Sequence, residues 1–368
     1  TNTPVPQERS DFGYPISDYA YDRYLEGAPG NPDLRWETAR KQNLGLEFSA
    51  LKNRVNLTAD FFRERRYDML LAAGARSNTV PPIFGQSPPA ANIGEATSKG
   101  VELEATLRNT HKNSLSYWLT ANWTVARSKV IYKESPELTP FYQRPEGYPL
   151  GQTRTGIATG YIESWDDLYV ATGGPDASRN QTLLPYDLVM LDFNSDGEFD
   201  GNTDAVPYGY PTYPQNNYGL SFGVDYKGIG LFVRFVGAYN TTRTIRGELF
   251  FNNNSFAPTY ILEDTRTPWY DNSNPTYPAL SLKDKTYTPI GDYTQFDGSF
   301  FRLQSAQLSY TLPGQITQPM GIKSLRIYVN GRNLLLWTHM PNDGVGIDYT
   351  DKNYPTKKQL NLGVNVQF

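Results

Sequence analysis

The chain lacks cysteine and has only two histidines, His111 and His339. The absence of cysteine excludes disulfides, thiolate zinc sites and cysteine nucleophiles. No H-E-x-x-H motif accompanies the two histidines, which argues against a catalytic zinc site, and no G-x-S-x-G elbow suggests a serine nucleophile. We therefore predict no catalytic residues and no enzymatic activity.

The sequence also lacks an excess of positive charge and any long hydrophobic run. Its formal net charge is -4 and it has no basic stripe, so nucleic acid is not an expected partner. No apolar run approaches the roughly 18 residues of a membrane helix. The opening residues, TNTPVPQERSDFGYP, do not resemble a signal peptide. Three alternatives follow: the chain is not exported, its signal has been removed, or it is part of a longer protein.

Alternation of apolar and polar residues is the dominant pattern. In NLGLEFSAL the apolar residues are Leu44, Leu46, Phe48 and Ala50, and in KQLNLGVNVQF they continue at every second position to Phe368. A period of two residues is typical of β-strands with one apolar face. It predicts about nine strands, near 40–51, 54–65, 97–109, 115–127, 216–227, 230–247, 299–312, 323–336 and 358–368. FRLQSAQLSYTL fits the alternation less well, which indicates a bulge.

The connections between these strands alternate between short and long. Short turns are expected at Lys52-Asn53 and at KGIG, and long loops at about 1–39, 66–96, 128–215, 248–298 and 337–357. Short turns on one side and long loops on the other are typical of a transmembrane β-barrel, with the long loops outside the cell. The fold class expected is all-β, an antiparallel barrel whose apolar strand face meets lipid and whose polar face lines a lumen. The 27 tyrosines and 6 tryptophans suit aromatic girdles at the membrane surfaces.

The direction of the strands predicts that more of the barrel exists. If the short turns are periplasmic, the first and last predicted strands run the same way, which requires an odd number of strands. Bacterial single-chain barrels use an even number. We therefore expect this sequence to be the C-terminal part of a larger barrel.

Several stretches resemble one family in the same order. They are GNPDLRWETARKQNLGLEFSALKNRVNLTADFFRERRYDML, NIGEATSKGVELEATL, LDFNSDGEFDGNTD, PQNNYGLSFGVDYKGIGLFVRFVGAY, FFRLQSAQLSYTLP with LRIYVNGRNLLLWT, and YPTKKQLNLGVNVQF. Together they resemble the TonB-dependent outer-membrane transporters, above all the SusC/RagA-like class, from about residue 30 to the end.

The resemblance implies a bacterial outer-membrane protein with a barrel of about 22 strands. It also implies an internal plug and a TonB-contacting segment, neither visible in this sequence. The implied partners are a SusD-like surface lipoprotein acting as a lid, the TonB complex, the remaining barrel and plug, outer-membrane lipid, and the barrel-assembly machinery, which would read Phe368. The implied function is energy-coupled import of oligosaccharides or peptides.

The acidic stretch DFNSDGEFDGNTD has oxygen-bearing side chains at positions 1, 3 and 5 and a glycine at position 6, as in calcium-binding loops. Thr203 stands where such loops carry a bidentate glutamate, and Asp204 is the next residue. One interpretation is a solvated acidic turn that needs no ion. The other is a calcium site, the only cofactor we consider, with ligands Asp192, Asn194, Asp196, Glu198, Asp200 and Asp204.

Three stretches, 161–176, 207–219 and 258–280, are rich in aromatic residues and proline. Exposed aromatic rings stack on sugars or pack against peptides, but they also pack loops together or contact a lid. We expect loop and lid packing for most of them and consider Trp165, Trp269 and Tyr270 as ligand or lid contacts.

Other functions remain as alternatives to import. A passive porin or structural barrel would lack the plug, and an outer-membrane enzyme on a barrel would need a clustered catalytic set. A soluble β-rich binding module would need no membrane. Paired carboxylates such as Glu102 and Glu104 suit a wet lumen wall better than a glycosidase site.

Overall fold

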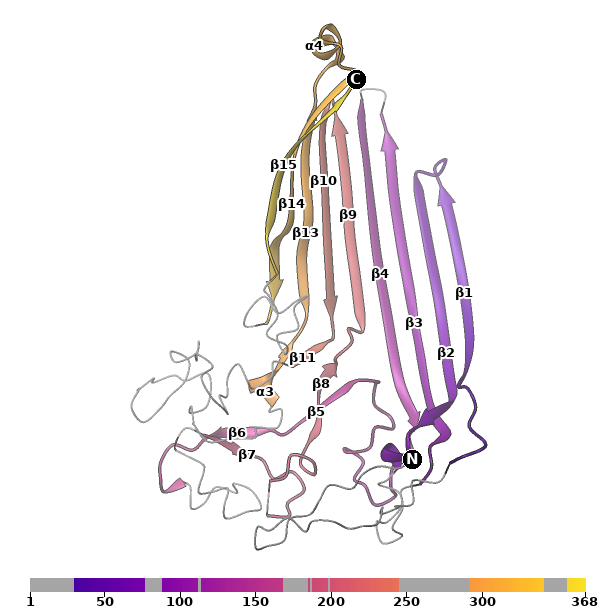
Figure 1. Ribbon diagram of the computed structural model, residues 1–368, viewed down its shortest axis with the longest axis vertical. Helices are drawn as coiled ribbons and strands as arrows, with labels where there is room; N and C mark the ends of the chain where they lie inside the picture. Colours follow the sequence, from indigo (N-terminus) through magenta and orange to yellow (C-terminus); the bar gives the residue numbers. More distant parts are fainter. Residues whose placement is uncertain are drawn as a thin grey trace, which may run out of the picture.

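The computed structural model describes residues 30–76, 88–111, 114–167, 185, 187–197, 199–244, 291–340 and 356–368. Its main feature is one antiparallel sheet of nine strands in the order β1-β2-β3-β4-β9-β10-β13-β14-β15 (Figure 1). The strands are β1 (Thr38–Ala50), β2 (Val55–Leu71), β3 (Ala91–Thr110), β4 (Leu115–Tyr132), β9 (Asn216–Tyr226), β10 (Ile229–Tyr239), β13 (Phe300–Thr311), β14 (Ser324–Thr338) and β15 (Gln359–Gln367). The all-β class and the nine antiparallel strands predicted from the alternation are confirmed.

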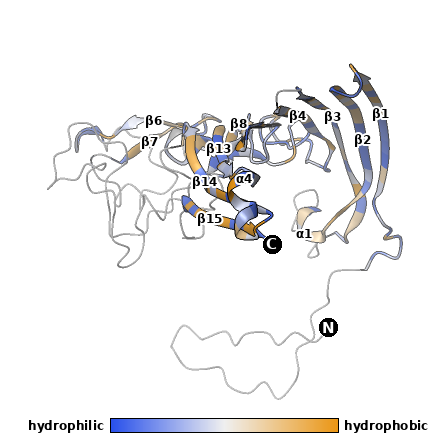
Figure 2. Ribbon diagram, turned by 90° about the horizontal axis from the view of Figure 1, so that it is seen from above, coloured by the Kyte–Doolittle hydropathy of each residue, from blue (hydrophilic) through white to orange (hydrophobic). Residues whose placement is uncertain are grey.

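The sheet is curved, with β1 and β15 at the two ends of an arc (Figure 2). Each of these end strands pairs with one neighbour only within the described residues, so this part of the chain forms an open barrel wall. None of the helices in the described ranges is long and apolar enough to cross a membrane.

The strand register places the alternating residues on two distinct faces. One row of directly paired residues is apolar or glycine in all nine strands: Ala50, Val55, Leu107, Leu119, Phe222, Val233, Ala306, Gly331 and Leu360. The adjacent row is polar in all nine: Ser49, Asn56, Thr106, Thr120, Ser221, Arg234, Ser305, Arg332 and Gln359. Because side chains alternate along a strand, these rows lie on opposite faces. We call the apolar one the outer face and the polar one the inner face.

Aromatic side chains gather on the outer face near the ends of the strands that lead into the long loops. The rings of Phe235 and Phe301 stack at 5.0 Å, and Trp337 lies 5.5 Å from Phe301. Tyr226 and Tyr310 lie toward the other end, beside the short turns. Two aromatic bands flanking an apolar band are typical of a membrane-spanning barrel.

The short turns have the backbone conformations that tight hairpins need. Lys227 and Gly228 join β9 to β10 with positive φ angles of 47° and 88°, as in a two-residue turn of type I′. The β1–β2 turn has positive φ at Leu51, Lys52 and Asn53. β13 and β14 are joined by α4 (Gly314–Thr317) and the 3-10 helix η6 (Gln318–Met320).

A bulge interrupts β13, as the weaker alternation of FRLQSAQLSYTL predicted. The register shifts between Leu303 and Ser305 against both β10 and β14, so Gln304 has no paired partner. The bulge changes which residues face outward. Ala306 lies on the outer face, whereas nearer the long loops Leu303 faces outward and Arg302 inward.

The predicted ends of several strands need correction. The strand predicted over 230–247 stops at Tyr239, because the positive φ of 55° at Asn240 breaks it, and Thr242–Thr244 forms a separate strand, β11. β2, β3 and β4 extend farther toward the long loops than predicted. In these added stretches register shifts near Met69 and between Glu95 and Ala96 break the alternation that marks the strands.

A second layer lies at the long-loop end of the sheet (Figure 1). Within the described residues it contains three small two-stranded antiparallel sheets, built from β5 (Gln152–Thr155) with β8 (Val206–Pro211), β6 (Ala158–Tyr161) with β7 (Leu188–Met190), and β11 with β12 (Gln295–Asp297). The helices α1 (Ala73–Arg76) and α3 (Gly291–Thr294) are single turns in the same region. We call this part of the structure the loop layer.

Candidate functional site

The inner face is the first candidate site, because it presents polar groups across every strand. Ser49 Oγ donates to Asn56 Oδ1 (2.8 Å), and the hydroxyls of Thr106 and Thr120 are 3.2 Å apart. Such cross-strand pairs satisfy each other while still facing water. The arrangement is suited to lining an aqueous passage and contains no catalytic set within the described residues.

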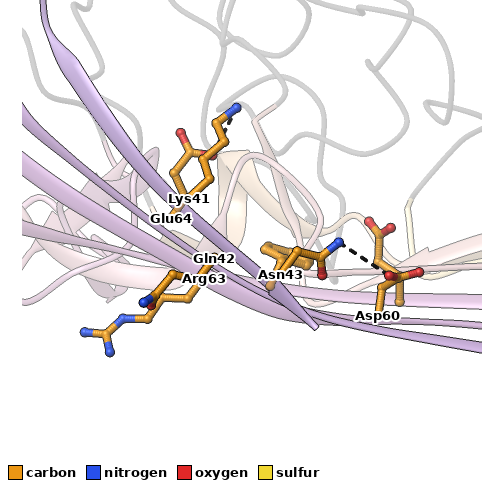
Figure 3. Close-up of a pocket in the computed structure, with 8 residues that line it drawn as sticks. Lys41, Gln42, Asn43, Asp60, Arg63 and Glu64 are labelled. Carbon is orange, nitrogen blue, oxygen red and sulfur yellow. Dashed lines mark hydrogen bonds and ion pairs between the residues drawn. The ribbon is translucent and has the colours of Figure 1, made fainter. Parts of the chain in front are cut away.

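A hollow of about 410 Å³ lies where β1, β2 and β3 meet. Figure 3 shows Lys41 and Glu64 on one side of the strands and Arg63 pointing to the opposite side, as the alternation requires. Lys41 Nζ lies 3.8 Å from Glu64 Oε2, and Asn43 Nδ2 donates to Asp60 Oδ1 at 3.4 Å. The lining residues are Lys41, Gln42, Asn43, Asp60, Phe62, Arg63, Glu64 and Glu102.

Charged groups on the inner face near the long loops form ion pairs. Arg66 Nε lies 2.5 Å from Glu64 Oε1, and its Nη1 lies 3.0 Å from Glu37 Oε1. With Lys41 on the other side of Glu64, these residues form a small network of alternating charge. The wall is therefore polar but close to charge-balanced at this position.

The loop layer has its own small core, which gives the outer mouth a defined shape. Ile162, Leu188 and Val206 are buried. Gly156 lies so close to Phe199 that an added Cβ would come within 2.8 Å of its ring. The N–H of Gly291 donates to the carbonyl of Gly156 (3.0 Å) and thus connects two loops far apart in the sequence.

The acidic stretch forms a compact turn in this layer. The buried carboxylate of Asp204 accepts hydrogen bonds from the N–H groups of Phe193 (2.9 Å), Asn194 (3.1 Å) and Asp200 (2.7 Å). Burial, reinforced by the negative charge of Asp204, raises the pKa of the Tyr142 hydroxyl, which donates to the carbonyl of Thr203 (2.9 Å).

The other predicted calcium ligands also bond within the loop. Asp192 accepts the N–H groups of Ser195 (2.7 Å) and Gly197 (2.8 Å), and Asn194 Nδ2 donates to Asp196 Oδ2 (2.7 Å). Among the residues that the structure describes, no group of three or more His, Cys, Asp or Glu could hold a metal ion, and Glu198 lies outside them. The calcium site stays a prediction.

Trp165 stands on an exposed turn that follows β6. Asp167 Oδ2 accepts hydrogen bonds from Ser164 N–H (2.7 Å), Ser164 Oγ (2.9 Å) and Glu163 N–H (3.1 Å), which fixes the turn. The indole of Trp165 is 61% exposed, so it is free to contact a ligand or a lid. Trp269 and Tyr270, the other two predicted contacts, lie outside the described residues.

Phe368 follows β15 at the short-turn end of the sheet and is 77% exposed. Its position continues the outward-facing series of Leu360, Leu362, Val364 and Val366. Its role as a signal for barrel assembly stays a prediction.

Sequence reasoning missed the contacts that fasten the loops. Arg76 makes a bidentate ion pair with Glu134, with Nε–Oε2 at 2.7 Å and Nη2–Oε1 at 3.0 Å. The partly buried guanidinium of Arg154 donates to the carbonyls of Tyr142 (3.3 Å) and Arg144 (2.6 Å), and burial lowers its pKa. No local pattern marks these residues, because their partners are 10 to 58 positions away.

Comparison with known proteins is consistent with this geometry. Residues 3–334 match the family described as TonB dependent receptor-like, beta-barrel. Two relatives from Formosa agariphila, TonB-dependent receptors P3 and P26, are each 25% identical to the chain and cover 92% and 93% of it. The chain spans only 35% and 36% of their lengths.

Two solved structures share the fold. The RagAB peptide transporter matches with a TM-score of 0.64 and 21% identity, over 94% of this chain and 37% of that one. The RagAB peptide importer in the open-open state matches with a TM-score of 0.63 and 20% identity, over the same shares of the two chains. The prediction of a TonB-dependent outer-membrane β-barrel is confirmed, and the two RagAB structures share its fold. The chain belongs to the TonB-dependent receptor-like β-barrel family of the bacterial outer membrane.

Proposed function

We propose that the chain forms part of the barrel of a SusC/RagA-like transporter that imports oligosaccharides or peptides across the outer membrane. The observation that carries this proposal is the pair of adjacent rows across all nine strands, one apolar except for Gly331 and the other polar throughout. The apolar row suits contact with lipid, and the polar row suits the wall of an aqueous passage. The family shown by the comparisons supplies the transport context.

In this proposal the chain contributes part of the barrel wall and part of its extracellular entrance. The inner face presents hydroxyl, amide and paired charged groups that exchange hydrogen bonds with a polar solute, while the loop layer shapes the entrance. A plug within the complete barrel would close the passage, and TonB would act on it from the periplasm. The residues of this chain therefore position solute and exclude lipid rather than supply energy.

A SusD-like lipoprotein is the proposed partner at the outer mouth. The compact loop layer, with Trp165 exposed on it, offers a preformed surface for such a lid. Solved relatives of similar fold carry the description of a peptide importer, which supports peptide as one substrate class, and oligosaccharide is the other. Calcium bound at Asp192–Asp204 would add rigidity to the same layer.

Uptake by intact cells tests the proposal. Cells lacking the complete gene are given it back, and uptake of labelled peptides and labelled oligosaccharides is measured with and without TonB. The proposal expects saturable uptake of one class that stops when TonB is removed. Uptake that persists without TonB, together with a standing conductance of the purified protein in planar bilayers, would instead identify a passive porin.

A further inference from the structure

The outer face of β1 to β4 carries a cluster of cations beside the apolar band. One cross-strand row consists of Gln42, Arg63, Lys99 and Arg127, and the next row toward the long loops consists of Arg40, Arg65, Thr97 and Lys129. Six of these eight residues are arginine or lysine. We call Arg40, Arg63, Arg65, Lys99, Arg127 and Lys129 the basic patch.

The basic patch begins abruptly where the apolar rows end. The row immediately before Arg63 and Lys99 is entirely apolar and consists of Leu44, Phe61, Val101 and Val125. Successive rows on one face are two residues, or about 7 Å, apart along the strand. The side chains therefore change from fully apolar to largely cationic within about 7 Å, at the edge of the lipid-facing band on the side of the long loops.

The inner face at the same level is organised differently. There Lys41 and Arg66 are neutralised by Glu64 and Glu37 in ion pairs. Within the described ranges, Arg40, Arg63, Lys99 and Lys129 are exposed and have no ion-pair partner. Arg65 pairs with Glu95 at 2.7 Å, and Arg127 Nη1 donates to the carbonyls of Ala126 (3.1 Å) and Gln215 (2.7 Å).

Like charges directly opposite each other on neighbouring strands destabilise a sheet. Arg63 and Lys99 are directly paired, and Lys99 is directly paired with Arg127. Anions bound on the outer face would therefore stabilise these three adjacent cations. Long basic side chains at a membrane boundary extend toward the head groups, so phosphate groups of lipids are the anions that lie at this level.

We infer that the basic patch binds the phosphate groups of anionic lipid in the outer leaflet, while the apolar row of Leu44, Phe61, Val101 and Val125 contacts the acyl chains of the same lipid. The patch is positively charged, lies at the edge of the lipid-facing band and adjoins an apolar row, as contact with such a lipid requires. Its place on the outer face separates it from the solute passage. This inference concerns the lipid-facing surface and does not depend on the transported substrate.

Binding of purified lipid A to the complete protein in detergent, followed by native mass spectrometry, tests the inference. The probes are lipid A with both phosphates and the same lipid with the phosphates removed. We expect the wild-type protein to bind the phosphorylated form at least about tenfold more tightly. The triple variant Arg63→Gln, Lys99→Gln, Lys129→Gln should lose this preference.

A charge-matched control removes three cations at the opposite end of the strands: Lys52→Gln, Lys227→Gln and Lys323→Gln. Its preference for phosphorylated lipid should stay within about twofold of wild type. Equal binding of the two lipids by wild type, or equal losses in both triple variants, would overturn the inference. Displacement of the lipid by an excess of inorganic phosphate would also overturn it, because it would identify a site for free phosphate.

Folding of each variant is checked by its migration on unheated denaturing gels, where folded barrels run faster. If the triple variant does not fold, the single variant Lys99→Gln decides, since its exposed side chain has no partner among the described residues. A loss of about fivefold in affinity for phosphorylated lipid A is expected. Unchanged affinity in this variant counts against the inference.

Discussion

Tyr328 on β14 lies directly opposite Gly363 on β15, and its ring occupies the space that a side chain at position 363 would need. A Cβ added to Gly363 would come within 2.3 Å of Tyr328 Cζ. The same relation joins Trp118 with Gly223, where the added Cβ would lie 2.4 Å from the indole nitrogen. On the inner face, glycines thus make room for aromatic rings that lie flat across the next strand.

The substitution Gly363→Ala should therefore loosen the last strand of the sheet. Moving the ring of Tyr328 destabilises the folded state by about 1–3 kcal/mol. The lower backbone entropy of alanine in the unfolded chain offsets only part of this loss. The measurement is the temperature at which the folded band disappears on denaturing gels, and we expect it to fall. Gly160→Ala is the control, because nothing lies within 4 Å of its added Cβ. Restoration by Tyr328→Ser in the double variant would assign the effect to the ring.

Asp204→Ala should unfold the acidic turn locally while leaving the sheet intact. The buried carboxylate accepts three backbone N–H groups, and removing it leaves these donors unsatisfied at a cost on the order of 3 kcal/mol. Hydrogen exchange should accelerate at the amides of Phe193, Asn194 and Asp200. Asp166→Ala, at an exposed position in the same layer, should leave these amides unchanged. Equal protection in both variants would contradict this role.

Calcium binding by the acidic stretch is a separate prediction. If the ion binds, its charge should draw the carboxylates of Asp192, Asp196 and Asp200 away from the backbone N–H groups and reduce their mutual repulsion. Calorimetric titration with calcium should then release or absorb measurable heat, and Asp196→Asn should reduce the affinity. A titration without heat at millimolar calcium removes the prediction and leaves a solvated turn held by Asp192 and Asp204.

Trp165→Ala tests the exposed indole as a contact for substrate or lid. The turn is fixed by Asp167 and not by Trp165, so the substitution should reduce uptake or lid affinity by about tenfold without altering the loop. The control is Leu138→Ala, which removes another highly exposed apolar side chain from the same layer. Full uptake and full lid affinity in the Trp165→Ala protein would exclude this residue as a contact.

Glu146 gives a pH-dependent contribution to the stability of the loop layer. Although burial opposes the effect, hydrogen bonds from Ser135 Oγ (2.6 Å) and from the N–H groups of Lys133 (2.9 Å) and Ser135 (3.3 Å) lower the pKa of its carboxyl group. A lowered folded-state pKa means that the contribution is complete above the unfolded-state pKa and is lost as the pH falls through the folded-state value.

Glu146→Gln should therefore lower the unfolding temperature at pH 7, and the difference from wild type should shrink as the pH falls below about 4. Circular dichroism during heating, recorded across this range, provides the measurement. The exposed Glu137→Gln variant should show no such trend. A difference that stays constant with pH would mean that the contribution of Glu146 does not depend on the charge of its carboxylate.

The sheet could be predicted from the sequence because its signal is local. The alternation in NLGLEFSAL and in KQLNLGVNVQF identifies both the strand and its apolar face, and the register then aligns these faces across neighbours. The end of β10 could not be predicted, because Val236–Tyr239 and Thr242–Thr244 read as one continuous β pattern. What separates them is the positive φ at Asn240 and the pairing of Thr242 with Asp297, which is distant in sequence.

The candidate site was predicted less completely. The inner polar face follows from alternation, whereas the hollow beside Lys41 and Glu64 depends on how three strands curve together. The pair of Arg76 with Glu134 depends on the folding of two loops and has no local signal. The basic patch did have a signal, since Arg63, Lys99 and Arg127 occupy positions that continue the apolar alternation of their strands.

The bulge at Gln304 keeps the apolar residues of both halves of β13 on the outer face. If β13 instead paired regularly with β10 and kept Gln304 in the ladder, Arg302 would turn toward the hydrocarbon and Leu303 toward water. Inserting or deleting one residue in the regular part of β13 would likewise exchange the two faces on one side of the change. β13 therefore tolerates changes of side chain far better than changes of spacing, and epitope tags belong in the exposed segments between strands. In a chain without cysteine, single cysteines placed along β13 should be accessible from the lipid side at even-numbered positions after Gln304 and at odd-numbered positions before it.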